Sequence, residues 1–134
     1  MGSGFSNLRV LDVARELNKA TYALTDERAF VADRDLRSQM RRAAISVVSN
    51  IAEGAERRTD AESAHFFYIA KASAGELRAQ LMASVDIGHI QESAAKPLIG
   101  MTYMIARMLS ALLRARESAK KSQTKEYPPK RKGS

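Results

Sequence analysis

Apolar residues recur every three or four positions through most of the chain, and this spacing restricts the fold more than any other feature of the sequence. Residues with this spacing lie on one face of an α-helix. The pattern is found in four stretches, at about 6–24, 33–54, 59–88 and 91–116. Aromatic residues make up only 6% of the chain, so strand-forming residues are too few for a sheet. The sequence therefore predicts an all-α protein.

Capping signals separate the four stretches. Asp33 can cap the second helix, and Gly54 is placed to end it. Thr59 and Glu62 have the spacing of a capping box for the third helix, and Gly88 is placed to end that helix. Amphipathic helices with short connections pack as antiparallel neighbours. The expected fold is an antiparallel up-and-down four-helix bundle.

The length of 134 residues favours one domain. We expect residues 1–4 to be a disordered N-terminus or a cloning scar, and residues 5–118 to form the bundle. Residues 119–134 have no apolar periodicity, contain two consecutive prolines, and have one large apolar side chain. Such a segment cannot offset the entropy lost on ordering. It is predicted to be a disordered basic tail.

The formal net charge of +7 lies mostly in this tail. Residues 119–134 contain six basic residues and one acidic residue, which is a net charge of +5 and leaves +2 for residues 1–118. Further arginines lie in the second helix and after it, where Asp33 and Asp35 offset part of their charge. Basic groups of this kind bind phosphate backbones without reading sequence, although a solvated helix face has the same composition. The predicted RNA- or DNA-binding residues are Arg41, Arg42, Arg57, Arg58, Lys120, Lys121, Lys125, Lys130, Arg131 and Lys132.

Two helices carry more apolar surface than one bundle core can cover. Residues 43–52 of the second helix are apolar or small on nearly all sides, and the fourth helix has apolar side chains beside its core stripe. Exposed apolar patches on soluble proteins usually mark subunit contacts, although these residues can also belong to the core. The predicted interface residues of a homo-oligomer are Ala44, Ile45, Val48, Tyr103 and Met104.

Several functional classes are disfavoured. The chain has no cysteine, which excludes disulfides, thiolate zinc sites and cysteine nucleophiles, and which fits a reducing, cytoplasmic setting. We find neither a run of about eighteen apolar residues nor a signal peptide, and therefore expect a soluble protein with no membrane partner.

The two histidines do not suggest a metal site. His65 and His89 each follow an acidic residue by three positions, a spacing that di-iron bundles use. Both lie on the third predicted helix, about 36 Å apart, so they cannot share a metal within one chain. We therefore expect no metal, no cofactor and no catalytic residue.

Ser46, Asn50 and Glu53 follow one side of the second helix and are candidates for a polar site with Ser73 and Glu76. No histidine or lysine at helical spacing is placed to activate either serine. Hydrogen bonding between helices is the favoured role for these side chains.

Residues 39–46 and 50–54 read QMRRAAIS and NIAEG, and they resemble the signature QxRRAAxSIxxNIAEG of the bacterial four-helix bundle family, also called the ribosomal-RNA intervening sequence proteins. The resemblance covers most of residues 5–90. It departs from the family at Leu11, where members often have Trp, in the loop after Phe30, and at Ala72. It implies a homopentameric ring and a link to nucleic acid.

Together these features predict a non-enzymatic, oligomeric bundle that binds RNA or DNA nonspecifically, as an accessory to a nucleic-acid machine. Sequence-specific readout is disfavoured because no zinc finger or aromatic stacking platform is found. The alternative is a protein-protein interaction scaffold with a protein partner and no nucleic-acid binding.

Overall fold

The computed structural model describes the backbone of residues 2–126 and the side chains of residues 9–118. Within this part, the chain is all-helical and contains no strand. The helices are α1 (Gly2–Leu24), α2 (Arg28–Ala32), α3 (Arg34–Glu56), α4 (Asp60–Asp86) and α5 (Glu92–Glu126).

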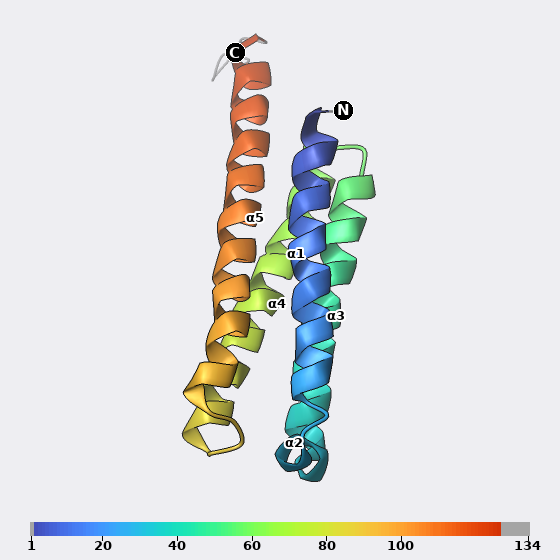
Figure 1. Ribbon diagram of the computed structural model, residues 1–134. Helices are drawn as coiled ribbons and strands as arrows, with labels where there is room; N and C mark the ends of the chain where they lie inside the picture. The colour runs from blue at the N-terminus through green and yellow to red at the C-terminus, as the bar shows by residue number, and fades with distance from the viewer. Residues whose placement is uncertain (1, 127–134) are drawn as a thin grey trace, which may run out of the picture.

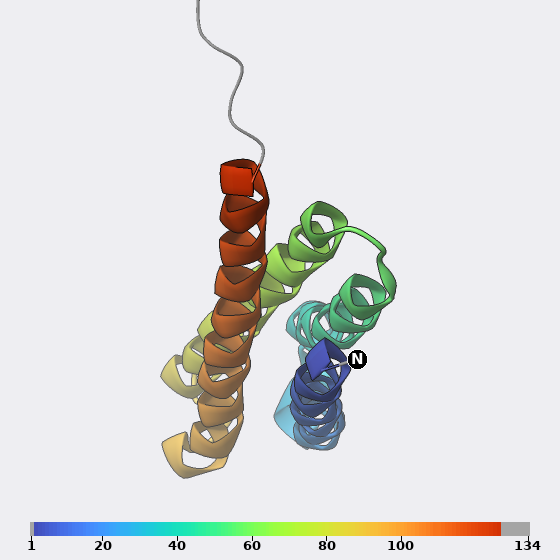
Figure 2. The same cartoon turned by 90° about the horizontal axis from the view of Figure 1, so that it is seen from above.

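The four long helices alternate in direction along a common axis (Figure 1). Helix α1 packs against α3 and α5, and α4 packs against the same two helices. The diagonal pairs α1 with α4 and α3 with α5 do not approach each other within the described chain. Figure 2 shows that α4 crosses α5 at an incline. This order is consistent with the predicted up-and-down bundle.

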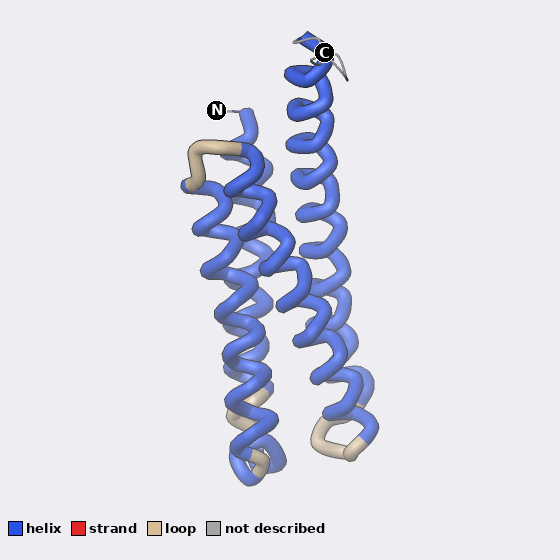
Figure 3. The backbone as a smooth tube through the Cα atoms, turned by 180° about the vertical axis from the view of Figure 1, so that it is seen from behind, coloured by secondary structure: helices blue, strands red, loops and turns tan. Residues whose placement is uncertain are grey.

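The connections lie at the two ends of the bundle (Figure 3). The start of α1, the end of α5 and the connection from α3 to α4 share one end, whereas α2 and the connection from α4 to α5 lie at the other. We refer to these as the terminal end and the α2 end.

One apolar stripe from each long helix forms the core. The predicted stripe of α3 is confirmed, because Met40, Ala43, Val47 and Ile51 are all buried. In α5, Leu109 and Leu113 lie beside the predicted core stripe and were counted as surplus apolar surface. Both are buried, because α5 contributes a broad face to the core. The largest fully buried side chains are Phe30, Phe67, Leu17, Met40, Ile51, Leu77, Leu81, Ile105 and Leu109.

Helix α2 was not predicted. The sequence of residues 25–31 shows only a break in periodicity, and a five-residue helix is too short to produce a periodic pattern. Its anchor is Phe30, which is fully buried and contacts the ring of His89 edge-on, with 5.3 Å between ring centroids. The segment therefore closes the α2 end of the core.

The predicted N-terminal caps of α3 and α4 are confirmed. Asp33 Oδ1 accepts a hydrogen bond from the Leu36 amide at 3.3 Å, and Thr59 Oγ1 accepts one from the Glu62 amide at 3.2 Å. Each cap satisfies one of the amides that a helix start leaves without an intrahelical partner.

Gly88 ends α4 as predicted. Its φ of 80° lies in the left-handed region that glycine adopts without strain. The Gly88 amide donates to Val85 O at 3.0 Å, and the His89 amide donates to Ser84 O at 2.9 Å. This pair of hydrogen bonds is the Schellman motif.

Gly54 does not end α3, because the helix continues to Glu56. A Cβ atom on Gly54 would lie 2.6 Å from Cε1 of Phe67 and 3.2 Å from the carbonyl oxygen of Ser63. The glycine is therefore needed for the close approach of α3 and α4. Ser63 Oγ donates to Gly54 O at 2.8 Å and accepts a hydrogen bond from Arg116 Nε at 3.0 Å, which joins α5 to the same contact.

Both ends of the described chain are more helical than expected. Helix α1 begins at Gly2, within the segment 1–4 that was expected to be disordered, and α5 continues to Glu126, eight residues into the segment predicted as a disordered tail. Residues 119–126 are mostly good helix formers, and extending an existing helix requires no new nucleation. The predicted tail residues 127–134 lie outside the described chain.

The expectation that no segment is long and apolar enough to span a membrane was wrong for α5. Residues Glu92–Ser118 reach a mean hydropathy of 1.3 and meet that test by length and composition alone. One third of the apolar window is buried inside the bundle. One helix of this kind within the described residues is weak evidence for a membrane span, because helices of other proteins pass the same test by length and composition.

At the α2 end, a side-chain hydrogen bond joins the cap of α3 to the connection between α4 and α5. His89 Nε2 donates to Asp33 Oδ2 at 2.9 Å. This bond and the Leu36 amide both favour the ionised carboxylate, so they hold the pKa of Asp33 below its usual value. Because the folded-state pKa is lower than the unfolded-state pKa, this contribution to stability is present above about pH 4 and is lost as pH falls further.

We therefore expect the Asp33→Asn variant to lose less stability than the wild type on acidification from about pH 5 to pH 3. Asparagine keeps the cap because it is an equally good N-cap residue. Urea unfolding at a series of pH values measures the difference, and Asp12→Asn on the exposed face of α1 is the control. Parallel acid profiles for the wild type and Asp33→Asn would contradict the prediction.

Candidate nucleic-acid interface

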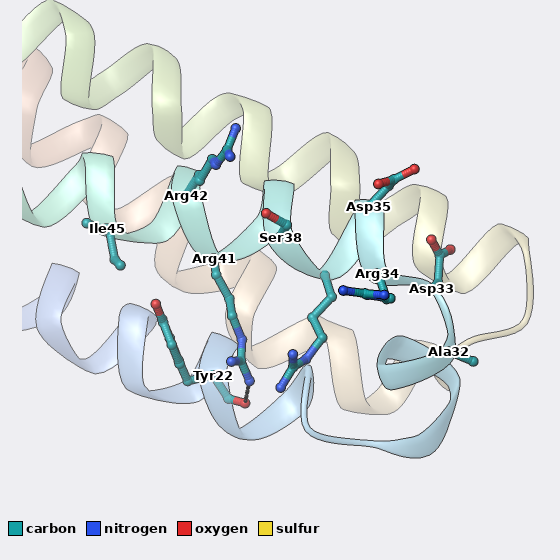
Figure 4. Close-up of a pocket in the computed structure, with 10 residues that line it drawn as sticks. Tyr22, Ala32, Asp33, Arg34, Asp35, Ser38, Arg41, Arg42 and Ile45 are labelled. Carbon is teal, nitrogen blue, oxygen red and sulfur yellow. Dashed lines mark hydrogen bonds between the residues drawn. The ribbon is translucent and has the colours of Figure 1, made fainter.

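The predicted arginines of α3 line an open groove between α1 and α3, close to the α2 end (Figure 4). The groove has a volume of about 890 Å³. Its walls are mostly polar, with Tyr22 on α1 and Ile45 on α3 as the large apolar contributors. The lining residues are Tyr22, Ala32, Asp33, Arg34, Asp35, Arg37, Ser38, Arg41, Arg42 and Ile45.

The Arg41 side chain makes most of its contacts within the bundle. Its Nε donates to Thr25 Oγ1 at 2.8 Å, and its Nη2 donates to Tyr22 O at 3.1 Å and to Asp26 Oδ1 at 2.9 Å. Its guanidinium also lies over the Tyr22 ring, 4.2 Å from the centroid. These contacts fix the C-terminal end of α1, where a cation is favourable beside unpaired carbonyl groups. Arg41 therefore has a structural role, and its predicted role in binding phosphate stays a prediction.

Arg37 completes this contact. Its Nε donates to Thr25 O at 2.9 Å, and its Nη2 lies 3.2 Å from Asp26 Oδ1. The hydrogen bonds from Arg41 and then Arg37 lower the pKa of Asp26. Arg37 and Arg41 thus share the carboxylate of Asp26, which offsets part of their charge.

Arg42, the other α3 arginine predicted to bind nucleic acid, is not paired with any described residue. Arg42 is exposed and makes no ion pair or hydrogen bond within residues 9–118, and Arg34 at the start of α3 is in the same condition. Figure 4 shows the Arg42 side chain directed away from the Arg41–Tyr22 contact. These two side chains are available to an anionic partner.

The other predicted groups lie at the terminal end. Arg57 Nη2 is 2.6 Å from Glu53 Oε2, and its guanidinium lies 4.6 Å from the centroid of the Phe66 ring, whereas Arg58 is exposed. Positions 120, 121 and 125 belong to the last turns of α5, at the same end of the bundle (Figure 1). Lys130, Arg131 and Lys132 lie outside the described chain. The α3–α4 connection and the end of α5 lie at the same end of the bundle, and Arg42 lies apart from both.

A second basic surface, not predicted from the sequence, runs along α4 and α5. Its basic side chains are Lys71 and Arg78 on α4 and Arg107 and Arg114 on α5. The sequence does contain a signal for it, since residues 93–116 include four basic residues and no acidic residue. The apolar stripe of this helix predicts its core face and gives no information about the basic residues on its outer face.

The polar side chains of α3 have the structural role that was favoured. Ser46 Oγ and Ser73 Oγ are 2.8 Å apart and join α3 to α4. The Asn50 amide donates to Ser46 O at 2.9 Å and lies 3.0 Å from Ser46 Oγ. Glu53 instead pairs with Arg57, and Glu76 is exposed, so neither extends this contact into a polar site.

The histidines lie apart. His65 is exposed and contacts the Phe66 ring edge-on, and His89 is bonded to Asp33 at the opposite end of the bundle. Within the described residues, no three histidine, cysteine or carboxylate side chains gather closely enough to hold a metal ion.

The predicted oligomer interface is only partly on the surface. Ala44 is fully buried in the core and cannot contact another chain, because it belongs to the face of α3 that packs inward. Ile45 is 46% exposed and Met104 is 40% exposed, while Val48 is partly buried against the core. Tyr103 is exposed but lies under the Arg78 guanidinium, so it faces the groove between α4 and α5.

Comparison with known proteins identifies the family. Residues 6–111 match the family model described as 23S rRNA-intervening sequence protein. The chain belongs to this family, as the QxRRAAxS and NIAEG residues indicated. The comparison with curated proteins gives no match.

A solved structure supports the fold. A protein of unknown function from the S23 ribosomal protein family of Bacteroides thetaiotaomicron superposes with a TM-score of 0.72. The similarity covers 81% of this chain and 98% of that chain, at 17% sequence identity. At this identity the likeness concerns the fold alone.

Proposed function

We propose that this protein is a non-enzymatic, oligomeric bundle that binds RNA or DNA through exposed basic side chains and serves as an accessory to a nucleic-acid machine. The observation that carries the proposal is the charge of α5. Residues 93–126 contain seven basic and two acidic residues along one continuous helix. A rod of this charge attracts the phosphate backbone and releases its condensed counterions, which favours binding without sequence preference.

Two further groups support the same partner. Arg58 lies at the terminal end, where α5 finishes, and the sequence beyond it adds Lys130, Arg131 and Lys132. Arg42 and Arg34 offer unpaired guanidinium groups on the α3 face. Base-reading geometry such as a helix pair presented to a groove is not among the described elements, so we propose nonspecific binding.

We further propose that the bundle self-associates, with the pentameric ring implied by the family resemblance as the preferred state. The exposed side chains Ile45 and Met104, together with Val48, are the candidates for this contact. Large apolar side chains exposed on two different helices fit the two unlike surfaces that a closed ring requires. Assembly would multiply the basic surface and strengthen its field.

A protein-protein interaction scaffold is the second candidate. It is favoured by exposed apolar side chains that lie outside the groups above, namely Val31, Met82 and Ile87 near the α2 end. A scaffold of this kind would bind a protein partner there and would show no salt-dependent affinity for nucleic acid.

Salt dependence tests the proposal. We expect the affinity for a short fluorescent RNA or DNA to fall steeply with salt, with a log-log slope of about −0.7 to −0.9 per phosphate contact. Replacing the six basic residues of 119–134 by glutamine should weaken binding at least about tenfold at low salt and flatten the slope by up to about 4 to 5. Glutamine keeps the chain length and the helix propensity of this segment.

Fluorescence anisotropy at several salt concentrations measures both quantities, and light scattering checks that the oligomer mass is unchanged. Equal binding by the glutamine variant would assign the interaction to the helix arginines and lysines. If neither protein binds at low salt, the scaffold candidate replaces the proposed function.

A further inference from the structure

The outer faces of α4 and α5 form a second groove, on the side of the bundle opposite the α1–α3 groove. On α4, Tyr68, Lys71, Gly75 and Arg78 follow one another at three- and four-residue steps, so they share one edge of the helix. Tyr68 and Lys71 line one part of the groove with Ser110, Leu113, Arg114 and Glu117. A second hollow, of about 440 Å³, adjoins it along α5 and shares Ser110 and Arg114 with it. Its lining residues all belong to α5: Tyr103, Ala106, Arg107, Ser110 and Arg114.

Small residues lie in and beside this groove. A Cβ atom on Gly75 would meet no other atom within 4 Å, so the glycine leaves open space and is not needed for packing. Ala106 and Ser110 on α5 are also short. Side chains therefore leave the surface open over Gly75, Ala106 and Ser110, and the two adjoining hollows follow the direction of α5.

Arg78 is oriented but not neutralised. Its Nε donates to Thr102 Oγ1 at 2.9 Å, and its guanidinium lies 3.8 Å from the centroid of the Tyr103 ring. Its two terminal nitrogens make no hydrogen bond within the described residues, and no carboxylate pairs with it there. A guanidinium held in this way is ready to bind an anion with little further loss of side-chain freedom.

The side chains that line the groove carry a net positive charge. The lining residues include three basic side chains, Lys71, Arg107 and Arg114, and one carboxylate, Glu117. Arg78 adds a fourth positive charge beside the lining residue Tyr103. The Glu117 carboxylate accepts a hydrogen bond from the Tyr68 hydroxyl at 3.4 Å. This excess of positive charge favours an anionic occupant. It also disfavours a second copy of the chain as the occupant, because the α1–α3 groove on the opposite face is arginine-rich as well.

Two exposed tyrosines distinguish between anionic partners. Tyr68 and Tyr103 are 51% and 46% exposed, and they stand at opposite ends of the groove. The groove extends from Tyr103 to the level of Glu117, which is about 21 Å along α5 and is enough for about four nucleotides of a single strand. Unstacked bases bind aromatic side chains, whereas an acidic peptide or a paired duplex offers no such base face.

We propose that the α4–α5 groove binds single-stranded RNA or DNA, with phosphates on Arg107, Arg114 and Lys71 and a base against the Arg78–Tyr103 pair. This inference rests on the proposed function and deepens it, because it selects single strands over duplexes and places them on one face. The basic residues of 119–134 then add affinity for either form of nucleic acid.

The test compares a labelled oligothymidylate of about twelve nucleotides with the corresponding duplex, by anisotropy on the full chain. We expect Tyr103→Ala to weaken single-strand binding about 5- to 100-fold and to leave duplex binding unchanged, whereas Tyr103→Phe keeps the stacking surface and the affinity. Arg107→Gln with Arg114→Gln should reduce the single-strand salt slope by about 1.4. The control removes the same charge from α1 by Arg15→Gln with Lys19→Gln, both exposed residues.

The outcomes separate this inference from the proposed function. If oligothymidylate binding depends on residues 119–134 but not on Tyr103, Arg107 or Arg114, the proposed function stands and the groove is not the site. An oligoglutamate peptide that competes with an affinity equal to that of oligothymidylate, without dependence on Tyr103, would show an acidic-peptide site and overturn the inference. A change in oligomer mass in the groove variants would also overturn it, because the groove would then be a subunit contact.

Discussion

Replacing Gly54 with alanine is expected to lower the free energy of unfolding by about 1–3 kcal/mol, because the added methyl group overpacks the contact between α3 and α4. The Cβ atom would lie 2.6 Å from the Phe67 ring and 3.2 Å from Ser63 O. Phe67 cannot move aside easily, since it is fully buried and the Arg116 guanidinium lies 4.9 Å from its ring centroid. The backbone of α4 must therefore shift.

Gly75→Ala is the matched control, because Gly75 also lies inside a helix but has open space around its Cβ position. That substitution should raise the free energy of unfolding by about 0.5–1 kcal/mol through helix propensity alone. Thermal unfolding separates the two variants, with about 3–5 °C for each kcal/mol in a chain of this length. Equal stability of the Gly54→Ala variant and the wild type would show that α3 and α4 are not in close contact here.

The NIAEG part of the family signature is explained mostly by packing. Ile51 is fully buried, Asn50 bonds to the carbonyl of Ser46, and Gly54 admits Phe67. Ile51 and Gly54 are buried and Asn50 is partly buried, whereas Glu53 of the same motif is exposed and pairs with Arg57. A motif of this kind predicts the fold with precision and says little about a binding partner, which is why the sequence identified the family and the helices more securely than the site.

The sequence predicted helices, caps and core stripes because each depends on local spacing. The N-caps Asp33 and Thr59 and the Gly88 stop are correct for this reason. It did not separate core from surface in α3, where Ala44 and Ile45 are adjacent and both apolar, yet one is buried and the other is 46% exposed. Their difference depends on which helix packs beside them, and periodicity within one helix does not contain that information.

The candidate binding residues were harder to predict for a related reason. A basic residue counts toward binding only if no neighbour uses its charge, and the partners of Arg41 come from residues 15 to 19 positions earlier in the chain. Conversely, Arg78 and Arg107 come from different helices, and only the packing of α4 on α5 places them along one groove. The fold therefore engages the charge of one predicted residue within the bundle and brings other basic residues together.

The adjacent pair in α3 gives the sharpest test of the oligomer proposal. Ala44→Glu should reduce the free energy of unfolding by about 3–5 kcal/mol, because a carboxylate at this fully buried position would have no cationic partner and would overpack the core. Ile45→Glu should leave the bundle folded, since the position is exposed and lies one turn from Arg41 and Arg42. If Ile45 contacts another subunit, this second variant should instead dissociate the oligomer.

Circular dichroism and multi-angle light scattering on both variants distinguish these results. We expect Ala44→Glu to lose helicity at a lower temperature, and Ile45→Glu to keep its helicity while its mass falls from about five times the chain mass of 14.8 kDa toward that of a single chain. A substitution to serine at position 45 is the control, because it reduces apolar area without introducing a charge and should weaken assembly only in part. If the wild type already has the mass of one chain at micromolar concentration, self-association is excluded, and the exposed side chains Ile45 and Met104 must then be assigned to a different protein partner.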